Sequence, residues 1–185
     1  MTDPIDQVAF RGALGRFAAG VTVASTVDRD GVDHAMTASA FCSVSMEPAL
    51  ILICVDRINR FHDAVIGSRK WAVSMLDEQA QDAATWFATR GRPLENQFGQ
   101  VPHHRGKHTQ AALLDDALAW LECTTWQAHD GGDHTILVGE VVAAAVRETV
   151  DDPLLYYRSH YGSLVRSAAS EKTTGETSPR TIGNA

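Results

Sequence analysis

The chain has 185 residues, 44% of them hydrophobic and 21% charged, which is ordinary for one globular domain with a core of its own. Its formal net charge is −7, so no overall basic field favours binding to nucleic acid or to an anionic membrane surface. The N-terminus shows no signal peptide, and the longest apolar stretch, residues 49–55, is too short to span a bilayer. Three cysteines, Cys42, Cys54 and Cys123, are an odd number without CxxC spacing, which favours reduced thiols in a cytoplasmic protein.

The beginning of the chain predicts a helix followed by a strand hairpin. Apolar residues recur there at helical spacing and form a single stripe, made of Phe10, Ala13, Leu14 and Phe17. We expect this helix to end at Gly20. Residues 21–26 alternate with the two-residue period of a strand, and the turn-forming residues 28–31 indicate that the strand returns as a hairpin.

Two strands and two helices are predicted in the middle of the chain. Residues 49–55 are continuously apolar, which is typical of a strand covered on both faces. A short helix is expected next, with its end at Gly67, and residues 71–76 predict another strand. The inward positions of the short helix are Phe61, Ala64 and Val65. A second clear helix carries Ala80, Ala83, Ala84 and Phe87 at helical spacing.

The rest of the domain combines a loop with long strands. Residues 91–110 predict a loop, residues 118–128 and 135–146 predict two long strands, and residues 129–133 predict the turn between them. Residues 167–185 are nearly free of apolar side chains and predict a disordered tail after one domain of residues 1–166. Many strands at hairpin spacing and few helices indicate a mainly β fold, an antiparallel barrel with peripheral helices. No Rossmann or P-loop glycine pattern is present.

The segment from Met36 to Ser45 is dense in small hydroxyl residues and directly precedes the apolar strand. Such residues let a planar ligand approach the main chain and satisfy its polar edges without bulk. An edge strand and turn rich in serine and threonine would have the same composition. Composition alone therefore leaves both interpretations open.

The order of several motifs resembles the flavin reductase family, the short reductases of two-component flavin monooxygenases. The run MTASAFCSVSMEPALILICV at residues 36–55 is similar to the signature of that family. FRGALGRFAAGVTVAST at residues 10–26 resembles its beginning, where residues 20–23 are typical of its first strand. Further matches are Phe98, the segments 121–123, 132–135 and 138–141, and the C-terminal segments 153–158 and 161–162. The resemblance covers roughly residues 10–165.

The resemblance implies a fold and an activity. The fold would be the antiparallel FMN-binding split β-barrel, usually a homodimer with the flavin near the subunit interface. The activity would be hydride transfer from NADH or NADPH to non-covalently bound FMN or FAD, followed by release of reduced flavin to a separate monooxygenase. The alternatives are a non-enzymatic flavin- or haem-binding module on the same barrel, and an oxidase similar to the pyridoxamine-phosphate oxidases.

The resemblance also assigns the flavin site. The ring and ribityl groups would contact Met36, Thr37, Ala38, Ser39 and Ala40, with Ser43 beside them. The end of the apolar strand and the loop after it would hold the ribityl and phosphate groups, through Cys54, Val55, Asp56, Asn59, Arg60, Phe61 and His62.

The phosphate end of this site suits an anion but departs from the family. Asn59 and the main-chain N–H groups at a helix N-terminus offer donors, and the helix dipole favours a negative charge there. Arg57 or Arg60 would add charge-assisted hydrogen bonds, or lie on a solvated helix face. Relatives commonly carry serines and a threonine where this chain has Asn59 and Phe61, which leaves the choice between FMN and FAD open.

The turn Gly132-Asp133-His134 resembles the motif that these reductases use for the nicotinamide nucleotide. His134 is the residue assigned to catalysis and nucleotide binding, since an imidazole at a barrel mouth can donate to a carboxamide or pyrophosphate oxygen; an exposed hairpin histidine is the alternative. Tyr161 and Arg158 are expected in the same nucleotide site. His129 and Asp133 lack a second ligand cluster, so no metal is assigned.

The predicted loop 91–110 also carries a basic cluster, made of His103, His104, Arg105, Lys107 and His108. It is either solvated surface or a lid that meets the phosphates of the dinucleotide.

Overall fold

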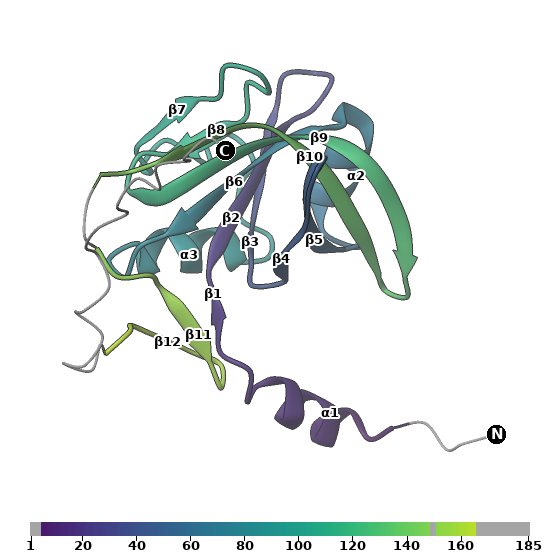
Figure 1. The fold of residues 1–185 in the computed structure, drawn as a ribbon, viewed down its shortest axis with the longest axis vertical. Coiled ribbons are helices and arrows are strands. Elements are labelled where there is room, and N and C mark those ends of the chain that lie inside the picture. Colours follow the sequence, from purple (N-terminus) through teal and green to yellow (C-terminus); the bar gives the residue numbers. More distant parts are fainter. Residues whose placement is uncertain (1–4, 149–150, 166–185) are drawn as a thin grey trace, which may run out of the picture.

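The computed structural model describes residues 5–148 and 151–165, and its main feature is one seven-stranded antiparallel sheet (Figure 1). In spatial order its strands are β3 (Asp33–Ala38), β2 (Thr22–Val27), β6 (Lys70–Leu76), β9 (Ala117–Gly131), β10 (His134–Val146), β5 (Ala49–Asp56) and β4 (Phe41–Met46). Every neighbouring pair is antiparallel. The mainly β, antiparallel architecture predicted from the strand spacing is confirmed.

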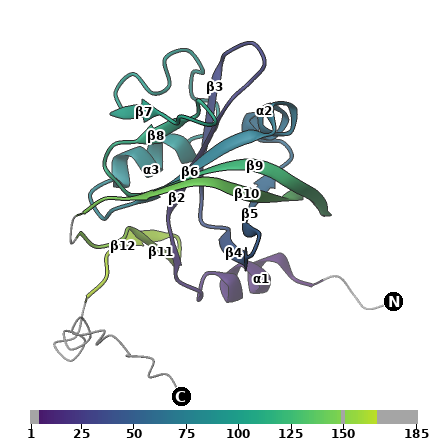
Figure 2. The same ribbon diagram turned by 45° about the horizontal axis from the view of Figure 1, so that its top comes forward.

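Helices and short strands surround this sheet. The helices are α1 (Gln7–Leu14), α2 (Arg60–Ser68) and α3 (Gln81–Ala88). A small sheet is formed by β1 (Ala19–Gly20), β11 (Leu155–Tyr157) and β12 (His160–Gly162), and a separate pair by β7 (His103–Arg105) and β8 (Ala112–Leu114). Figure 2 shows the long β9–β10 ribbon crossing the molecule below α2 and α3.

The two edge strands of the main sheet are consecutive in the chain. Only Ser39 and Ala40 separate the end of β3 from the start of β4. The Cys54 N–H donates to the Ala40 carbonyl at 3.2 Å, which extends the pairing of β4 with β5 to Ala40. β3 and β4 do not pair with each other, and α2 packs against β2, β3, β5 and β6. The sheet is therefore an open, split barrel.

Of three apolar clusters among the described residues, the two larger ones fill this frame. One lies inside the sheet and is centred on Trp71, Phe61, Ile53 and Leu137. Gly139 on β10 lies directly against it, because a Cβ atom at that position would stand 2.3 Å from Cζ2 of Trp71. The other cluster packs α3 onto the sheet and includes Phe87, Phe98, Leu76 and Leu154.

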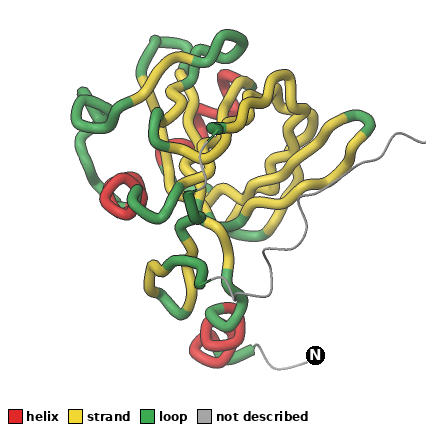
Figure 3. Tube along the Cα trace, turned by 60° about the vertical axis from the view of Figure 1, so that its left-hand side comes forward, coloured by secondary structure: helices red, strands yellow, loops and turns green. Residues whose placement is uncertain are grey.

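The first helix differs from its prediction. α1 begins after the Asp6 cap and ends at Leu14, with Gly15 as its C-cap, whereas Gly20 lies in β1. Its apolar stripe is exposed rather than packed on the core, since Phe10 and Leu14 are 43% and 58% exposed. Figure 3 shows α1 standing apart from the barrel. Helical spacing predicts an apolar face but not the surface that covers it.

The apolar strand β5 is also covered less completely than predicted. Ile51, Ile53 and Val55 are buried, but the alternate residues Leu50, Leu52 and Cys54 are only half-buried. Within one chain this strand therefore has one buried face. The predicted C-terminal tail, residues 167–185, lies outside the described residues.

Candidate functional site

Only part of the segment Met36–Ala40 is exposed to solvent. Met36 and Ala38 point into the core, with 5% and 7% of their surface exposed. The Thr37 hydroxyl donates to the Ala84 carbonyl of α3 at 2.6 Å, which ties β3 to that helix. Ser39 and Ala40 are exposed. A bound ring would therefore meet the side chains of Ser39 and Ala40, and would meet Met36 and Ala38 only through their main chain.

A largely apolar cavity of about 400 Å³ adjoins this exposed wall. It reaches Ser39 and Phe41 from one side and Gly20, Thr22 and Leu154 from the other. Glycine and other small residues along its rim allow close approach of a flat ligand to the main chain. Ser43, on the exposed side of β4, does not line this cavity.

The loop after β5 is shaped by two side-chain caps. Asp56 Oδ1 accepts from the Ile58 N–H, and Asn59 Oδ1 accepts from the Phe61 N–H, both at 3.0 Å. Asn59 is therefore the N-cap of α2, and its side-chain amide N–H groups remain as donors. Val55 and Phe61 are each 1% exposed, so their side chains belong to the core and only their main chain can reach a ligand.

A cleft of about 260 Å³ opens at the N-terminus of α2 and is rich in arginine. It is lined by Asn59 and Asp56 together with Arg60, Arg90 and Arg92. Arg90 pairs with Asp56 at 3.1 Å, and Arg60 Nη2 donates to the Arg92 carbonyl at 2.5 Å. Arg57 lies elsewhere, paired with Asp130 at 3.2 Å.

Arg92 is the unusual member of this cleft because it is 9% exposed and has no carboxylate partner among the described residues. Its guanidinium donates to the carbonyls of Phe87, at 2.9 Å, and of Ala35, while its Nε is buried without a partner. Burial, and secondly the charge of Arg60, lower the pKa of Arg92 to about 10, so it stays cationic at neutral pH. The guanidinium also donates to the Thr89 carbonyl and to Gln97 Oε1, so Arg92 contributes positive charge rather than free donors to the cleft. That charge, together with the N-terminus of α2, would suit a phosphate group.

Sequence reasoning identified Arg60 and Asn59 in this cleft but missed Arg90 and Arg92. The available signal was the pair of arginines around Gly91, directly after the α3 pattern. A charged residue in a loop normally indicates surface, so this signal was weak.

His134 lies at the corner next to the same cleft. It pairs across the sheet with Asp56, and its Nδ1 is 2.7 Å from Asp133 Oδ1. The hydrogen bond and charge of His134 lower the pKa of Asp133. His62, on α2, places Nε2 2.9 Å from the Thr135 hydroxyl and Nδ1 2.9 Å from Asp63. Neighbouring residues of a strand point to opposite faces. His134 and the Thr135–His62 pair therefore lie on opposite faces of the start of β10.

The other two residues predicted for the nucleotide site lie on a different element. Tyr161 packs against the α3 cluster and edge-on to Tyr156 at 5.3 Å, and Arg158 is in the β11–β12 turn. Within the described part of the chain no contact joins Tyr161 or Arg158 to His134. In Figure 1 the β11–β12 hairpin and the β9–β10 turn lie at separate corners of the molecule. One chain alone does not bring the three residues together.

The basic loop is held by its own contacts rather than poised over the β9–β10 turn. Arg105 forms two hydrogen bonds with Asp33, and His104 lies 2.7 Å from Asp115 and edge-on to Trp120. Trp120 is on β9 and precedes Gly131 by eleven residues, which corresponds to roughly 35 Å of strand. The alternative of solvated surface fits this position better than a lid near His134 of the same chain.

Residues 5–148 and 151–165 contain no group of three or more His, Cys, Asp or Glu residues that could hold a metal ion. None of their helices is long and apolar enough to cross a membrane.

Comparisons with known proteins identify the family of the chain. Residues 14–165 match the model of the flavin reductase like domain. The chain is 35% identical to a flavin reductase (NADH) of Kitasatospora aureofaciens, over 85% of this chain and 81% of the relative. It is 39% identical to an NADH-dependent FAD reductase of Streptomyces globisporus, over 78% of this chain and 79% of the relative.

Solved structures of such enzymes superpose on the fold. BorF, the flavin reductase component of a bacterial two-component tryptophan halogenase, gives a TM-score of 0.81 at 37% identity, covering 88% of this chain and all of BorF. The NADH:FAD oxidoreductase SgcE6 of Streptomyces globisporus, in complex with NAD and FAD fragments, gives 0.83 at 33% identity, covering 91% of this chain and 98% of SgcE6. The chain therefore belongs to the flavin reductase family and is a flavin reductase of the split-barrel fold.

Proposed function

We propose that the chain passes a hydride from NADH or NADPH to FMN or FAD held beside Ser39 and Ala40, and that the reduced flavin leaves for a separate monooxygenase. The observation that carries the placement of the flavin is the arginine cleft, where Arg92 is buried as a cation without a carboxylate. The flavin and the nicotinamide supply the redox chemistry, and the protein orients them and excludes water.

The flavin phosphate is assigned to the arginine cleft. Arg60 and Arg92 provide guanidinium groups, the Asn59 amide provides neutral donors, and the N-terminus of α2 adds its dipole. Arg90 is already paired with Asp56, so it adds less charge. From this cleft the ribityl chain would follow the end of β5 past Cys54 towards Ser39.

The flavin ring is assigned to the exposed wall at Ser39 and Ala40. Small side chains there leave the main-chain N–H and C=O groups accessible, and the adjoining apolar cavity accepts a flat hydrophobic edge. Ser39 and Ala40 are the segment that connects the edge strands β3 and β4. The ring would therefore lie along the opening of the split barrel.

A homodimer would complete the site. The outer face of β4 and β5 exposes Val44 and Met46, at 48% and 91%, and the β9–β10 ribbon exposes Trp126 at 48%. A second copy would cover these side chains and the apolar stripe of α1. It would also let His134 of one chain and Tyr161 of the other enclose one nicotinamide nucleotide, an arrangement that a single chain does not provide.

The partner and the compartment are inferred from context. BorF, which resembles this chain, is named as one component of a two-component halogenase, and a reductase that holds its flavin non-covalently can release it to such a partner. All three cysteines are free thiols, which fits the reducing conditions of the cytoplasm.

The test is to mix the protein with NADH or NADPH and with FMN, FAD or riboflavin, and to follow the absorbance of the reduced nicotinamide. We expect oxidation above the protein-free blank with at least one nucleotide and one flavin. Oxidation no faster than the blank in all six mixtures would refute the proposed reaction.

A further inference from the structure

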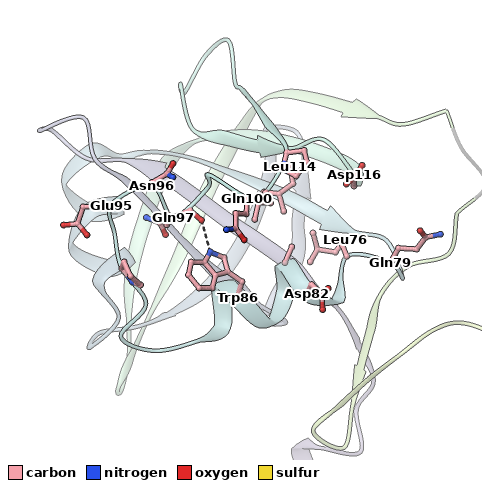
Figure 4. A pocket seen from close by; sticks show the side chains of 15 residues that line it. Leu76, Gln79, Asp82, Trp86, Glu95, Asn96, Gln97, Gln100, Leu114 and Asp116 are labelled. Atoms are coloured by element: carbon pink, nitrogen blue, oxygen red, sulfur yellow. Dashed lines mark hydrogen bonds between the residues drawn. The ribbon is translucent and has the colours of Figure 1, made fainter.

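A cavity of about 580 Å³ lies along the N-terminal part of α3, between that helix and residues 93–102 (Figure 4). The arginine cleft adjoins the other end of α3, at Phe87 and Ala88. Leu76 is the one lining residue that this cavity shares with the apolar cavity beside Ser39, and none of the residues assigned to contact the flavin or the nicotinamide nucleotide lines it. Its volume is within the range of small-molecule sites, roughly 300–1,000 Å³.

The cavity combines an apolar floor with one fixed aromatic ring. The floor is formed by Leu76, Ala80, Ala83, Val101, Pro102 and Leu114. The indole of Trp86 is 37% exposed, and its Nε1–H donates to the Gln97 carbonyl at 2.8 Å, as Figure 4 shows. Because this hydrogen bond fixes the ring, Trp86 can stack on a ligand without losing much side-chain entropy on binding.

The charge of the lining has a single sign. Asp82, Glu95 and Asp116 are among its fifteen residues, and none of the fifteen is a lysine, arginine or histidine. Within the part of the chain that the structure describes, no ion pair is formed by these three carboxylates. The pKa of Arg147 is raised chiefly by its hydrogen bond to Asp77, and the charge of Asp116 contributes to the same rise.

This charge selects the class of ligand. Flavin and nicotinamide nucleotides carry phosphates, which three carboxylates would repel. A protonated amine would be attracted to the carboxylates, and its apolar part could lie on the floor and against the indole face. The side-chain amides of Gln79, Asn96 and Gln100 add hydrogen-bonding groups to the rim.

We propose that this cavity is a binding site for small apolar amines in their protonated form, separate from the flavin and nucleotide sites. In Figure 4 Glu95 lies at the opposite end of the cavity from Asp82 and Asp116. The ammonium group lies beside Asp82 or Asp116, and the hydrocarbon or aromatic part lies against Trp86 and the apolar floor. The inference does not depend on the proposed reaction, because no residue of that reaction lines the cavity.

The experiment compares three probes of similar shape and different charge by ligand-observed NMR: 2-phenylethylamine, 2-phenylethanol and phenylacetate. We expect the amine to bind most tightly and the phenylacetate anion least. Asp82→Asn/Glu95→Gln/Asp116→Asn should weaken amine binding roughly tenfold and leave the alcohol nearly unchanged. The matched control, Asp30→Asn/Glu47→Gln/Glu148→Gln, removes three exposed carboxylates outside the cavity and should bind the amine like the original protein.

Further measurements locate the bound amine. Ala83→Leu fills the floor and should weaken all three probes, and a saturating concentration of FMN or NADH should leave amine binding unchanged. The proposal is overturned if phenylacetate binds as well as the amine, if the triple variant keeps the original affinity, or if FMN or NADH displaces the amine.

Discussion

Arg60 donates a hydrogen bond to the main-chain carbonyl of Arg92, at 2.5 Å, so two guanidinium groups share one cleft. The charge of Arg60 contributes to the lowered pKa of Arg92, as expected for like charges near each other. A ligand that brings negative charge would relieve this repulsion, which supports the proposed placement of the flavin phosphate.

Arg60→Gln should raise the KM for FMN by roughly tenfold, because one charge-assisted hydrogen bond to the phosphate is lost. The KM for riboflavin, which has no phosphate, should stay the same. Arg57→Gln is the control, since Arg57 is paired with Asp130 outside the cleft. Steady-state kinetics with both flavins checks this, and an equal rise for riboflavin would place the phosphate elsewhere.

Inorganic phosphate alone should stabilise the flavin-free protein. A ligand at ten times its dissociation constant adds about 1.4 kcal/mol of stability, or a rise in Tm of about 3 °C for a chain of this size. Thermal unfolding in phosphate and in chloride at equal ionic strength measures the effect. The same rise in Arg60→Gln would show that the anion binds at another site.

Gly139→Ala should destabilise the fold by about 2 kcal/mol or more, because the added methyl overlaps the fully buried ring of Trp71. Gly12→Ala is a fitting comparison, since that position in α1 has nothing within 4 Å of a built Cβ. There the change should be neutral or stabilising by roughly 1 kcal/mol. Urea unfolding of both variants measures their free energies of unfolding. Equal midpoints for the two variants would mean that the Trp71 ring can move aside.

Glu122 should make the stability of the protein depend on acid pH. Its carboxylate is 6% exposed and accepts the main-chain N–H groups of Lys107, His108 and Thr109 and the Thr109 hydroxyl, at 2.8–3.1 Å. Burial alone would raise the pKa of Glu122, but these hydrogen bonds and the charge of His108 outweigh it and hold the pKa below its ordinary value.

A lowered pKa in the folded state means that this stabilisation is complete above the unfolded value of about 4.3 and is lost as the pH falls through the lower folded value. Glu122→Gln should cost about 2 kcal/mol at neutral pH and reduce the loss of stability in acid. Urea midpoints from pH 3 to pH 7, with Glu148→Gln as an exposed control, test this. A midpoint like that of the original protein at neutral pH would contradict it.

Val44→Lys/Met46→Lys should convert a dimer into monomers, because two charges would be buried at the proposed interface on β4. Ile66→Lys, at an exposed position on α2, should not change the assembly. Sedimentation of the three proteins gives their masses. A double variant that remains dimeric would exclude this face of β4 as the interface.

The long elements were predictable from the sequence because their periodicity is sustained. The β9–β10 ribbon, α2 and α3 all lie where spacing indicated, with Phe61 and Phe87 inward. Strands of two or three residues, such as β1 and β8, show no period and are formed only by their partners. The exposed apolar stripe of α1 shows a related limit. Its spacing predicts an apolar helix face, but it does not indicate which surface packs against that face.

The sequence indicated part of the candidate site. Motif order drew attention to Ser39, Ala40 and Asn59, which the structure places on an exposed wall and at the N-cap of α2, and their contact with a flavin stays a prediction. The burial of Arg92 was not predictable, because it depends on carbonyls of Ala35 and Phe87 that approach it only after folding. The separation of His134 from Tyr161 within one chain likewise depends on tertiary arrangement, which local patterns do not encode.

The dipeptide Ser39-Ala40 joins the two edge strands of the sheet and also carries the exposed wall. Local opening of a protein begins where the fewest contacts hold it, and β3 and β4 form no ladder with each other. Separating these two strands would destroy the surface that we propose for the flavin, and a bound flavin would resist the separation. Binding of flavin would thus stabilise the junction between β3 and β4, and its release would destabilise that junction. The local stability of the barrel would therefore rise and fall once in each catalytic cycle.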